Sequence, residues 1–161
     1  MASEKLQIKT SLKIQKPINE VFEAIVDSEK MSNYFISKGS GRMETGKTIN
    51  WRFPEFDMEF PVFVDEVKQN KFISYRWQDF EDGKETTVNI SLEEMNDGTF
   101  VTVTEKEREN DEKGIQWLAA NTGGWANFLA CLKAWLEYGV HLRKGAFDIS
   151  QMPKKETDIT V

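Results

Sequence analysis

The chain has 161 residues, which fits a single domain with a substantial hydrophobic core. Its net charge is −6 and its lysines and arginines are scattered, which argues against nucleic acid as a partner, because nucleic acids bind clustered positive charge. No segment reaches the ~20 apolar residues of a membrane span, and the charged N-terminus lacks the apolar core of a signal peptide, so we expect a cytoplasmic protein.

The N-terminal part of the sequence predicts one strand followed by two short helices. Apolar residues of one parity alternate with lysines over Leu6–Ile14, which is typical of a half-buried strand. Pro17 ends this strand and opens a helix whose apolar face continues as far as Val26, and acidic residues close behind the proline favour its start. Ser28 is suited to cap the second short helix.

The middle of the sequence predicts an antiparallel meander. Apolar and polar residues alternate in a series of short segments, as expected for strands with one buried face. Turn signals separate the segments, and Asp82-Gly83 and Asn96-Asp97-Gly98 are the clearest of them. Together with the first strand, these segments make a sheet of six to seven strands. The expected strands lie at 49–53, 56–64, 73–77, 88–92 and 100–104.

The segment from residue 114 to residue 144 predicts one long helix. Its apolar stripe, at steps of three and four, is flanked by further large side chains, and so wide an arc indicates that a concave sheet grips the helix. We expect this helix to stop near Lys144-Gly145. The prediction is therefore an α+β domain over residues 1–149, with a curved antiparallel sheet around a long C-terminal helix, and a polar tail over residues 150–161. The stripe and its flanks are Leu118, Thr122, Trp125, Leu129, Leu132 and Leu136, with Trp117, Asn121, Phe128 and Trp135 beside them.

Several short motifs follow one another along the chain in an order that resembles a known family. They are Ile14-Gln15-Lys16-Pro17, Glu20-Val21-Phe22-Glu23-Ala24-Ile25, Tyr34-Phe35, Val64-Asp65-Glu66-Val67, Ile73-Ser74-Tyr75-Arg76-Trp77, Thr86-Thr87-Val88-Asn89-Ile90, Gly98-Thr99-Phe100-Val101-Thr102-Val103-Thr104 and Gly124-Trp125. The order of elements resembles the helix-grip fold of the START-like (SRPBCC) superfamily. The motifs are similar to the family named for activators of the heat shock protein 90 ATPase. The resemblance implies a hydrophobic cavity but not one activity, because related folds carry different sites.

The polar residues predict no metal and no cofactor. One histidine, one cysteine and no carboxylates at ligand spacing leave no metal site, and there is no glycine-rich phosphate loop. Glu105, Glu107 and Glu109 alternate with Lys106 and Arg108, which we interpret as a solvated strand end. The positions expected to face the interior are nearly all apolar, so we expect no catalytic residue.

The large side chains between sheet and helix carry the functional prediction. They either pack into a closed core or line a pocket for an apolar or planar ligand. Gly123-Gly124 inside the helix costs about 1–2 kcal/mol in helix propensity relative to two alanines. A close approach of the sheet, a kink of the helix or room for a ligand would each account for this cost. The candidate ligand-binding residues are Trp51, Phe53, Phe60, Tyr75, Trp77, Trp117, Asn121, Trp125 and Phe128.

Three functions remain open at this point. The first is non-catalytic binding of an apolar small molecule or lipid in the cavity, by a monomer or weak dimer. The second, which the resemblance implies, is a protein-interaction module that acts on the ATPase of heat shock protein 90 in the stress response. The third is an enzyme of the cyclase or hydrolase type, which requires a buried titratable group in the cavity.

Overall fold

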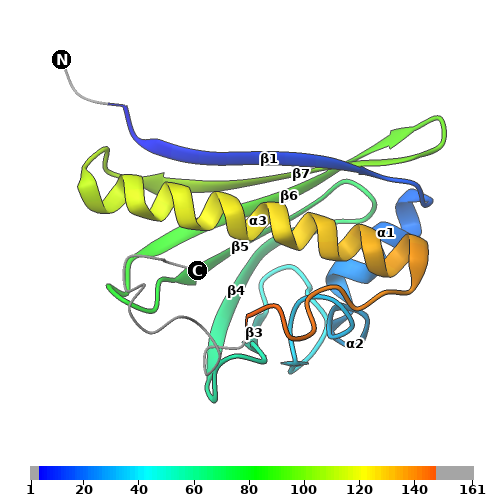
Figure 1. Cartoon of the computed structure of the whole chain (residues 1–161), viewed down its shortest axis with the longest axis horizontal. Helices are drawn as coiled ribbons and strands as arrows, with labels where there is room; N and C mark the ends of the chain where they lie inside the picture. The colour runs from blue at the N-terminus through cyan, green and yellow to red at the C-terminus, as the bar shows by residue number, and fades with distance from the viewer. Residues whose placement is uncertain (1–3, 148–161) are drawn as a thin grey trace.

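The computed structural model describes residues 4–147, so the polar tail predicted at 150–161 lies outside the described residues. Seven strands form one sheet in the order β1-β7-β6-β5-β4-β3-β2, and all neighbouring strands are antiparallel. The sheet curves around a long helix (Figure 1). The predicted helix-grip fold with six to seven strands is therefore confirmed. The strands are β1 (Leu6–Ile14), β2 (Lys38–Gly39), β3 (Thr48–Arg52), β4 (Glu59–Lys68), β5 (Phe72–Gln78), β6 (Glu85–Met95) and β7 (Gly98–Arg108).

Two short helices follow β1, as expected. They are α1 (Ile18–Val26) and α2 (Ser28–Met31). Asp27, rather than the predicted Ser28, caps α2, and its carboxylate accepts hydrogen bonds from the backbone N–H groups of Glu29 and Lys30 at 2.9 and 3.2 Å. The cap falls on Asp27 because its extended backbone separates the two helices, whereas Ser28 already has helical geometry.

The third helix, α3 (Glu112–Tyr138), is continuous over 27 residues. Asp111 caps its start, with its carboxylate accepting a hydrogen bond from the Gly114 N–H at 2.8 Å. The predicted end near Lys144-Gly145 is wrong, because Gly139 adopts a left-handed backbone with a φ of 66° and terminates the helix. Glycine enters this conformation at little cost, which makes it a common helix stop. The segment after Gly139 is thereby free to turn back toward the sheet.

Helix α3 lies along β1 on the concave side of the sheet (Figure 1). Two polar contacts fasten its C-terminal half to the end of β1: Lys133 Nζ donates to the Lys13 carbonyl at 3.3 Å, and the Gln15 N–H donates to Glu137 at 2.9 Å. The same half of the helix closes the hydrophobic core against α1 and the sheet. The core side chains it contributes are Phe128, Leu129, Cys131 and Leu132.

The loop between β3 and β4 differs from the prediction and shapes the site. We expected a strand from residue 56, but β4 begins at Glu59, and residues 53–58 form a loop. Alternation from Phe56 to Val64 misled the prediction, because the same apolar spacing also occurs where a loop packs its rings against neighbouring rings. This loop carries Phe53 and Phe56 toward the N-terminal half of α3.

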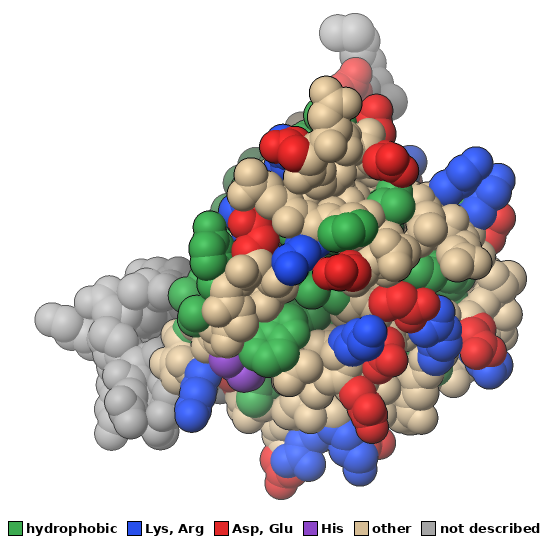
Figure 2. Space-filling view, turned by 90° about the vertical axis from the view of Figure 1, so that its right-hand side faces the viewer, with side chains coloured by type: hydrophobic (Ala, Val, Ile, Leu, Met, Phe, Trp, Pro, Cys, Tyr) green, Lys and Arg blue, Asp and Glu red, His purple; other side chains and the backbone are tan. Residues whose placement is uncertain are grey.

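The surface shows the mixed charge that the composition indicates. On the face that includes α1 and the end of α3, acidic and basic side chains are interspersed (Figure 2). On the outer face of the sheet, Arg76 pairs with Asp65 at 3.0 Å and with Glu85 at 3.3 Å. None of the helices within residues 4–147 is long and apolar enough to cross a membrane.

Candidate functional site

A cavity of about 720 Å³ lies between α3 and the sheet. Its walls come from segments far apart in the sequence: residues 117–127 of α3, the ends of β5, β6 and β7, the β3–β4 and β5–β6 loops, and the segment after α3. The cavity exists because α3 runs close to β1, which leaves a gap between the helix and the β5–β6 side of the sheet.

Aromatic rings form one wall of this cavity, and they hold one another in place. The ring centroid of Phe53 lies 5.1 Å from that of Phe35 and 5.1 Å from that of Phe60. The indoles of Trp77 and Trp125 lie 5.6 Å apart. Aromatic pairs of this kind contribute about 0.5–1.5 kcal/mol each beyond the area that they bury. The wall is therefore preformed rather than assembled around a ligand.

Gly123 and Gly124 border the cavity on the helix side. A Cβ atom at either position would meet no atom within 4 Å, so a close approach of the sheet does not explain these glycines. Helix α3 is also continuous through both of them. Both glycines are solvent-exposed, so the cavity is open on this side, and of the three explanations offered by the sequence, open space beside the helix agrees best with this geometry.

Six of the nine predicted ligand-binding residues line the cavity; they are Phe53, Phe60, Trp77, Trp117, Asn121 and Trp125. The other three, Trp51, Tyr75 and Phe128, do not line it. They are at most 1% exposed and pack behind the wall, where the Tyr75 ring lies 5.4 Å from Trp77 and the Phe128 ring 5.3 Å from Trp125. Alternation placed them on the correct face of their elements but could not show how far the cavity extends. That the six lining residues bind a ligand stays a prediction.

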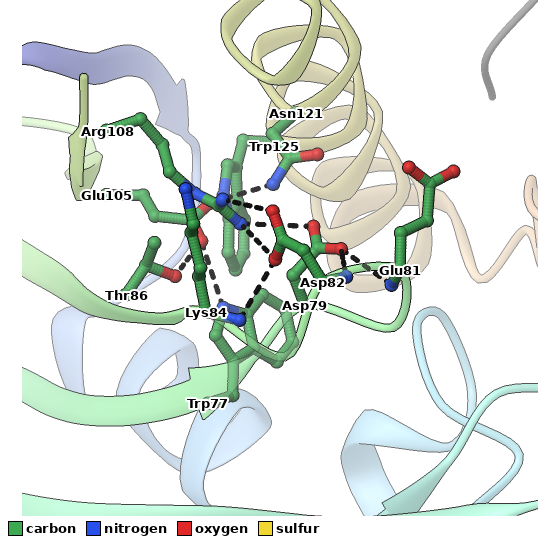
Figure 3. A network of polar contacts seen from close by, with 10 residues as sticks. All are labelled: Trp77, Asp79, Glu81, Asp82, Lys84, Thr86, Glu105, Arg108, Asn121 and Trp125. Atoms are coloured by element: carbon green, nitrogen blue, oxygen red, sulfur yellow. Dashed lines mark hydrogen bonds and ion pairs between the residues drawn. The ribbon is translucent and has the colours of Figure 1, made fainter. Parts of the chain in front are cut away.

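Glu105 on β7 is the polar centre of the site, and the sequence analysis missed it. It is 1% exposed, so our interpretation of a solvated strand end is wrong at this position. Its Oε2 accepts hydrogen bonds from Trp77 Nε1 at 3.0 Å and Thr86 Oγ1 at 2.5 Å (Figure 3). Its Oε1 accepts from Trp125 Nε1 at 2.8 Å and Asn121 Nδ2 at 3.3 Å. One carboxylate thereby joins three strands to the middle of α3.

A signal for Glu105 was present in the sequence. Val101 and Val103 alternate with threonines and are buried in the structure, and Glu105 continues their parity. The pattern breaks only after it, because the pairing of β1 with β7 shifts between Leu6 and Gln7. An extra residue on one strand re-aims the side chains that follow, so Arg108 turns inward where Glu107 would have been expected.

Arg108 lies beside Glu105 on the cavity wall and is fully matched by carboxylates. It is 8% exposed and pairs with Asp82 at 2.7 Å and with Asp79 at 3.3 Å, both on the β5–β6 loop (Figure 3). Its guanidinium also stacks over Trp117, 5.6 Å from the ring centroid. The hydrogen bond from Arg108 is the main reason why the pKa of Asp82 lies below its ordinary value.

A second arginine stands at the mouth of the cavity. Arg143, from the segment after α3, pairs with Glu55 on the β3–β4 loop, and both side chains are about nine-tenths buried. Its guanidinium lies over the rings of Phe53 and Phe147, at 5.4 and 4.8 Å from their centroids. These contacts fasten the C-terminal segment across the β3–β4 loop.

The importance of Glu105 can be tested by comparing two glutamates of the same strand. Glu105→Ala leaves two indole N–H groups, a hydroxyl and an amide without their acceptor, so we expect a loss of about 2–4 kcal/mol in the free energy of unfolding. Glu107→Ala, at an exposed position, should change it by less than about 0.5 kcal/mol. Urea denaturation followed by tryptophan fluorescence measures both. Equal stability of the two variants would contradict the anchoring role.

The pairing of Asp82 with Arg108 predicts a pH-dependent contribution to stability. Because the folded-state pKa of Asp82 is lowered, its contribution is fully present above the ordinary value of 3.8 and is lost as the pH falls through the folded value. Asp82→Asn should therefore cost about 1 kcal/mol at pH 7 and progressively less below pH 4. Thermal melts across this range measure the difference. Asp57→Asn, whose carboxylate is 94% exposed, is the control, and an equal pH dependence there would refute the assignment.

Known proteins resemble this chain in structure. The protein SSP2350 from Staphylococcus saprophyticus is 36% identical, with a TM-score of 0.75, and the match covers 86% of this chain and 96% of that one. DynU16, from the dynemicin biosynthetic locus, is 25% identical with a TM-score of 0.75; the match covers 84% of this chain but only 48% of DynU16.

A third structural relative is the Aha1 dimer from Colwellia psychrerythraea, which is 23% identical with a TM-score of 0.71 and covers 83% of this chain and 98% of that one. At this identity, the likeness shows the fold alone. No curated protein matches the chain. The family model described as "Activator of Hsp90 ATPase homolog 1-like protein" matches residues 15–137, which is most of the sequence, and the chain belongs to this family.

Proposed function

We propose that this protein binds an apolar small molecule in the cavity between α3 and the sheet, without catalysing a reaction. The observation that carries the proposal is the volume of about 720 Å³ behind a wall of aromatic rings. Sites for small ligands typically enclose roughly 300–1,000 Å³ and combine apolar walls with a few polar groups. A closed core, which was the alternative to a pocket, would leave no such space.

The polar groups of the cavity support binding more than catalysis. An enzyme of the cyclase or hydrolase type requires a buried titratable group, and Glu105 meets that condition. A carboxylate has about four lone-pair sites, however, and Glu105 already accepts four hydrogen bonds. Glu105 can accept a proton from a substrate only after one of these donors has left, so the observed arrangement favours binding over general-base catalysis. Glu105 therefore suits a role in shaping the cavity.

A neutral fluorescent probe, N-phenyl-1-naphthylamine, tests the proposal. We expect saturable binding of one probe per chain. Gly124→Phe should weaken binding at least about tenfold, because its ring enters the open space beside Gly124.

The matched control is Ala126→Phe on the same helix, an exposed position that does not line the cavity, and it should bind as the wild type does. Circular dichroism checks that both variants fold. Equal probe affinity of the two variants would place the probe elsewhere, and an absence of saturable binding to the wild type would remove the proposal.

The family description supports a second candidate, which is an interaction with the heat shock protein 90 chaperone. Exposed apolar side chains at the cavity mouth offer a contact surface for a protein, since Phe56 and Phe80 are 41% and 53% exposed and their rings lie 5.7 Å apart. If this candidate holds, the purified chain should raise the steady-state ATPase rate of the chaperone, and Phe56→Ser with Phe80→Ser should abolish the increase. An unchanged rate at saturating concentrations of the wild-type chain would remove it.

A further inference from the structure

The charge of Glu105 is not matched by a positive charge. All four of its hydrogen-bond donors are neutral groups: two indoles, a hydroxyl and an amide. Within residues 4–147, it forms no ion pair with a lysine, an arginine or the histidine. Both of its oxygens accept from indole N–H groups, which can only donate, and this arrangement suits the ionised carboxylate. Among the described residues, the cavity wall therefore contains a buried carboxylate that forms no ion pair.

The two arginines that line the cavity are already committed to other carboxylates. Arg108 pairs with Asp79 and Asp82, and Arg143 pairs with Glu55. Their Nε atoms are buried and have no hydrogen-bond partner among the described residues. A ligand anion would thus meet more carboxylates than guanidiniums, while a ligand cation would meet an excess of negative charge.

The walls next to Glu105 also favour a cation. Trp77 and Trp125 both line the cavity and are both tied to this carboxylate through their N–H groups. Indole faces carry partial negative charge and attract ammonium groups, most strongly where water is excluded. The carboxylate and the rings therefore act in the same direction on a positively charged group.

Asn121 is the donor that a ligand can most easily displace from Glu105. Since all lone-pair sites of the carboxylate are in use, an incoming donor must replace one of the four present donors. The Asn121 bond, at 3.3 Å, is the longest of the four, and Asn121 is only half-buried, whereas Thr86 and Trp125 are buried. We therefore expect a rotation of the Asn121 side chain to expose Oε1 to the cavity.

We infer that the ligand of this cavity combines an apolar, ring-containing body with a protonated amine, which displaces the Asn121 amide and pairs with Glu105. The inference rests on the proposed function, because it names the class of molecule that the same cavity takes. The apolar body of the ligand fills the space between the aromatic wall and Gly123-Gly124. The protonated amine supplies the positive partner that the Glu105 carboxylate does not have among the described residues. Neutral and anionic ligands of the same shape bind less tightly.

Three naphthalene compounds that differ only in their polar group test this inference: 1-naphthylmethylamine, 1-naphthylmethanol and 1-naphthoate. Each competes at pH 7 with bound N-phenyl-1-naphthylamine. We expect the amine to bind at least about tenfold more tightly than the alcohol, and the carboxylate less tightly than the alcohol. If the neutral fluorophore binds but the amine has no advantage over the alcohol, the inference is wrong and the proposed function stands. If no probe binds, the proposed function itself fails.

Two variants at one position test whether Glu105 is the site of the amine. Asn121→Lys supplies a built-in ammonium that reaches Glu105, so the advantage of the amine over the alcohol should fall to less than about twofold. Asn121→Met has a side chain of similar length to lysine without the charge, and it removes the amide donor to Oε1, so the advantage should persist or grow. The ratio of the two affinities within each variant is the readout, which removes any effect of side-chain volume. A full amine advantage in Asn121→Lys would overturn the assignment to Glu105.

Discussion

The carboxylate of Glu105 is the contact on which the architecture around the cavity depends. It lies on β7 and accepts hydrogen bonds from Trp77 on β5, Thr86 on β6, and Asn121 and Trp125 on α3. Burying a carboxylate costs several kcal/mol unless its oxygens are satisfied, and four donors satisfy this one. Because the backbone of α3 stays close to β1, only long side chains bridge the helix to β5 and β6. Glu105 holds the indoles of Trp77 and Trp125 in place through hydrogen bonds, so the sheet and the helix stay apart and the gap between them stays open.

An open cavity lowers the stability of the folded chain, both at the aromatic wall and at the two glycines of α3. The rings of the wall lack partners on their cavity side and lose dispersion contacts there. Gly123-Gly124 adds a further loss of about 1–2 kcal/mol in helix propensity, although alanine would fit at both positions without a clash. A ligand that fills the space restores contacts to the rings and stabilises the folded chain in proportion to its saturation. The features that weaken the empty protein are therefore the ones from which the proposed ligand would gain binding energy.

Periodicity was sufficient to predict the fold and only part of the site. The alternation of Leu6–Ile14 matches β1, and the helical stripe placed α3 on the concave side of the sheet, since both patterns report which face of an element is buried. The end of α3 was missed because Gly139 was not weighed against the apolar residues that follow it. The sequence could not predict which aromatic residues line the cavity and which pack behind it. Trp51 and Phe53 share a parity, but only Phe53 borders the cavity. Depth within the gap depends on the path of α3, which no local pattern specifies.

The residues that set the character of the cavity are those that depart from the regular pattern. Glu105 places a carboxylate on a buried face, the register shift between β1 and β7 turns Arg108 inward, and two glycines lie inside a continuous helix. Sequence rules tend to fail at functional sites, where local stability is given up for a specific geometry. Membership of the family follows from the regular pattern, which any member needs in order to fold. The proposed preference for a cationic ligand rests on the exceptions, so we expect a relative that shares the sheet and the helix but has an apolar residue in place of Glu105 to enclose a cavity of similar shape that prefers an uncharged ligand.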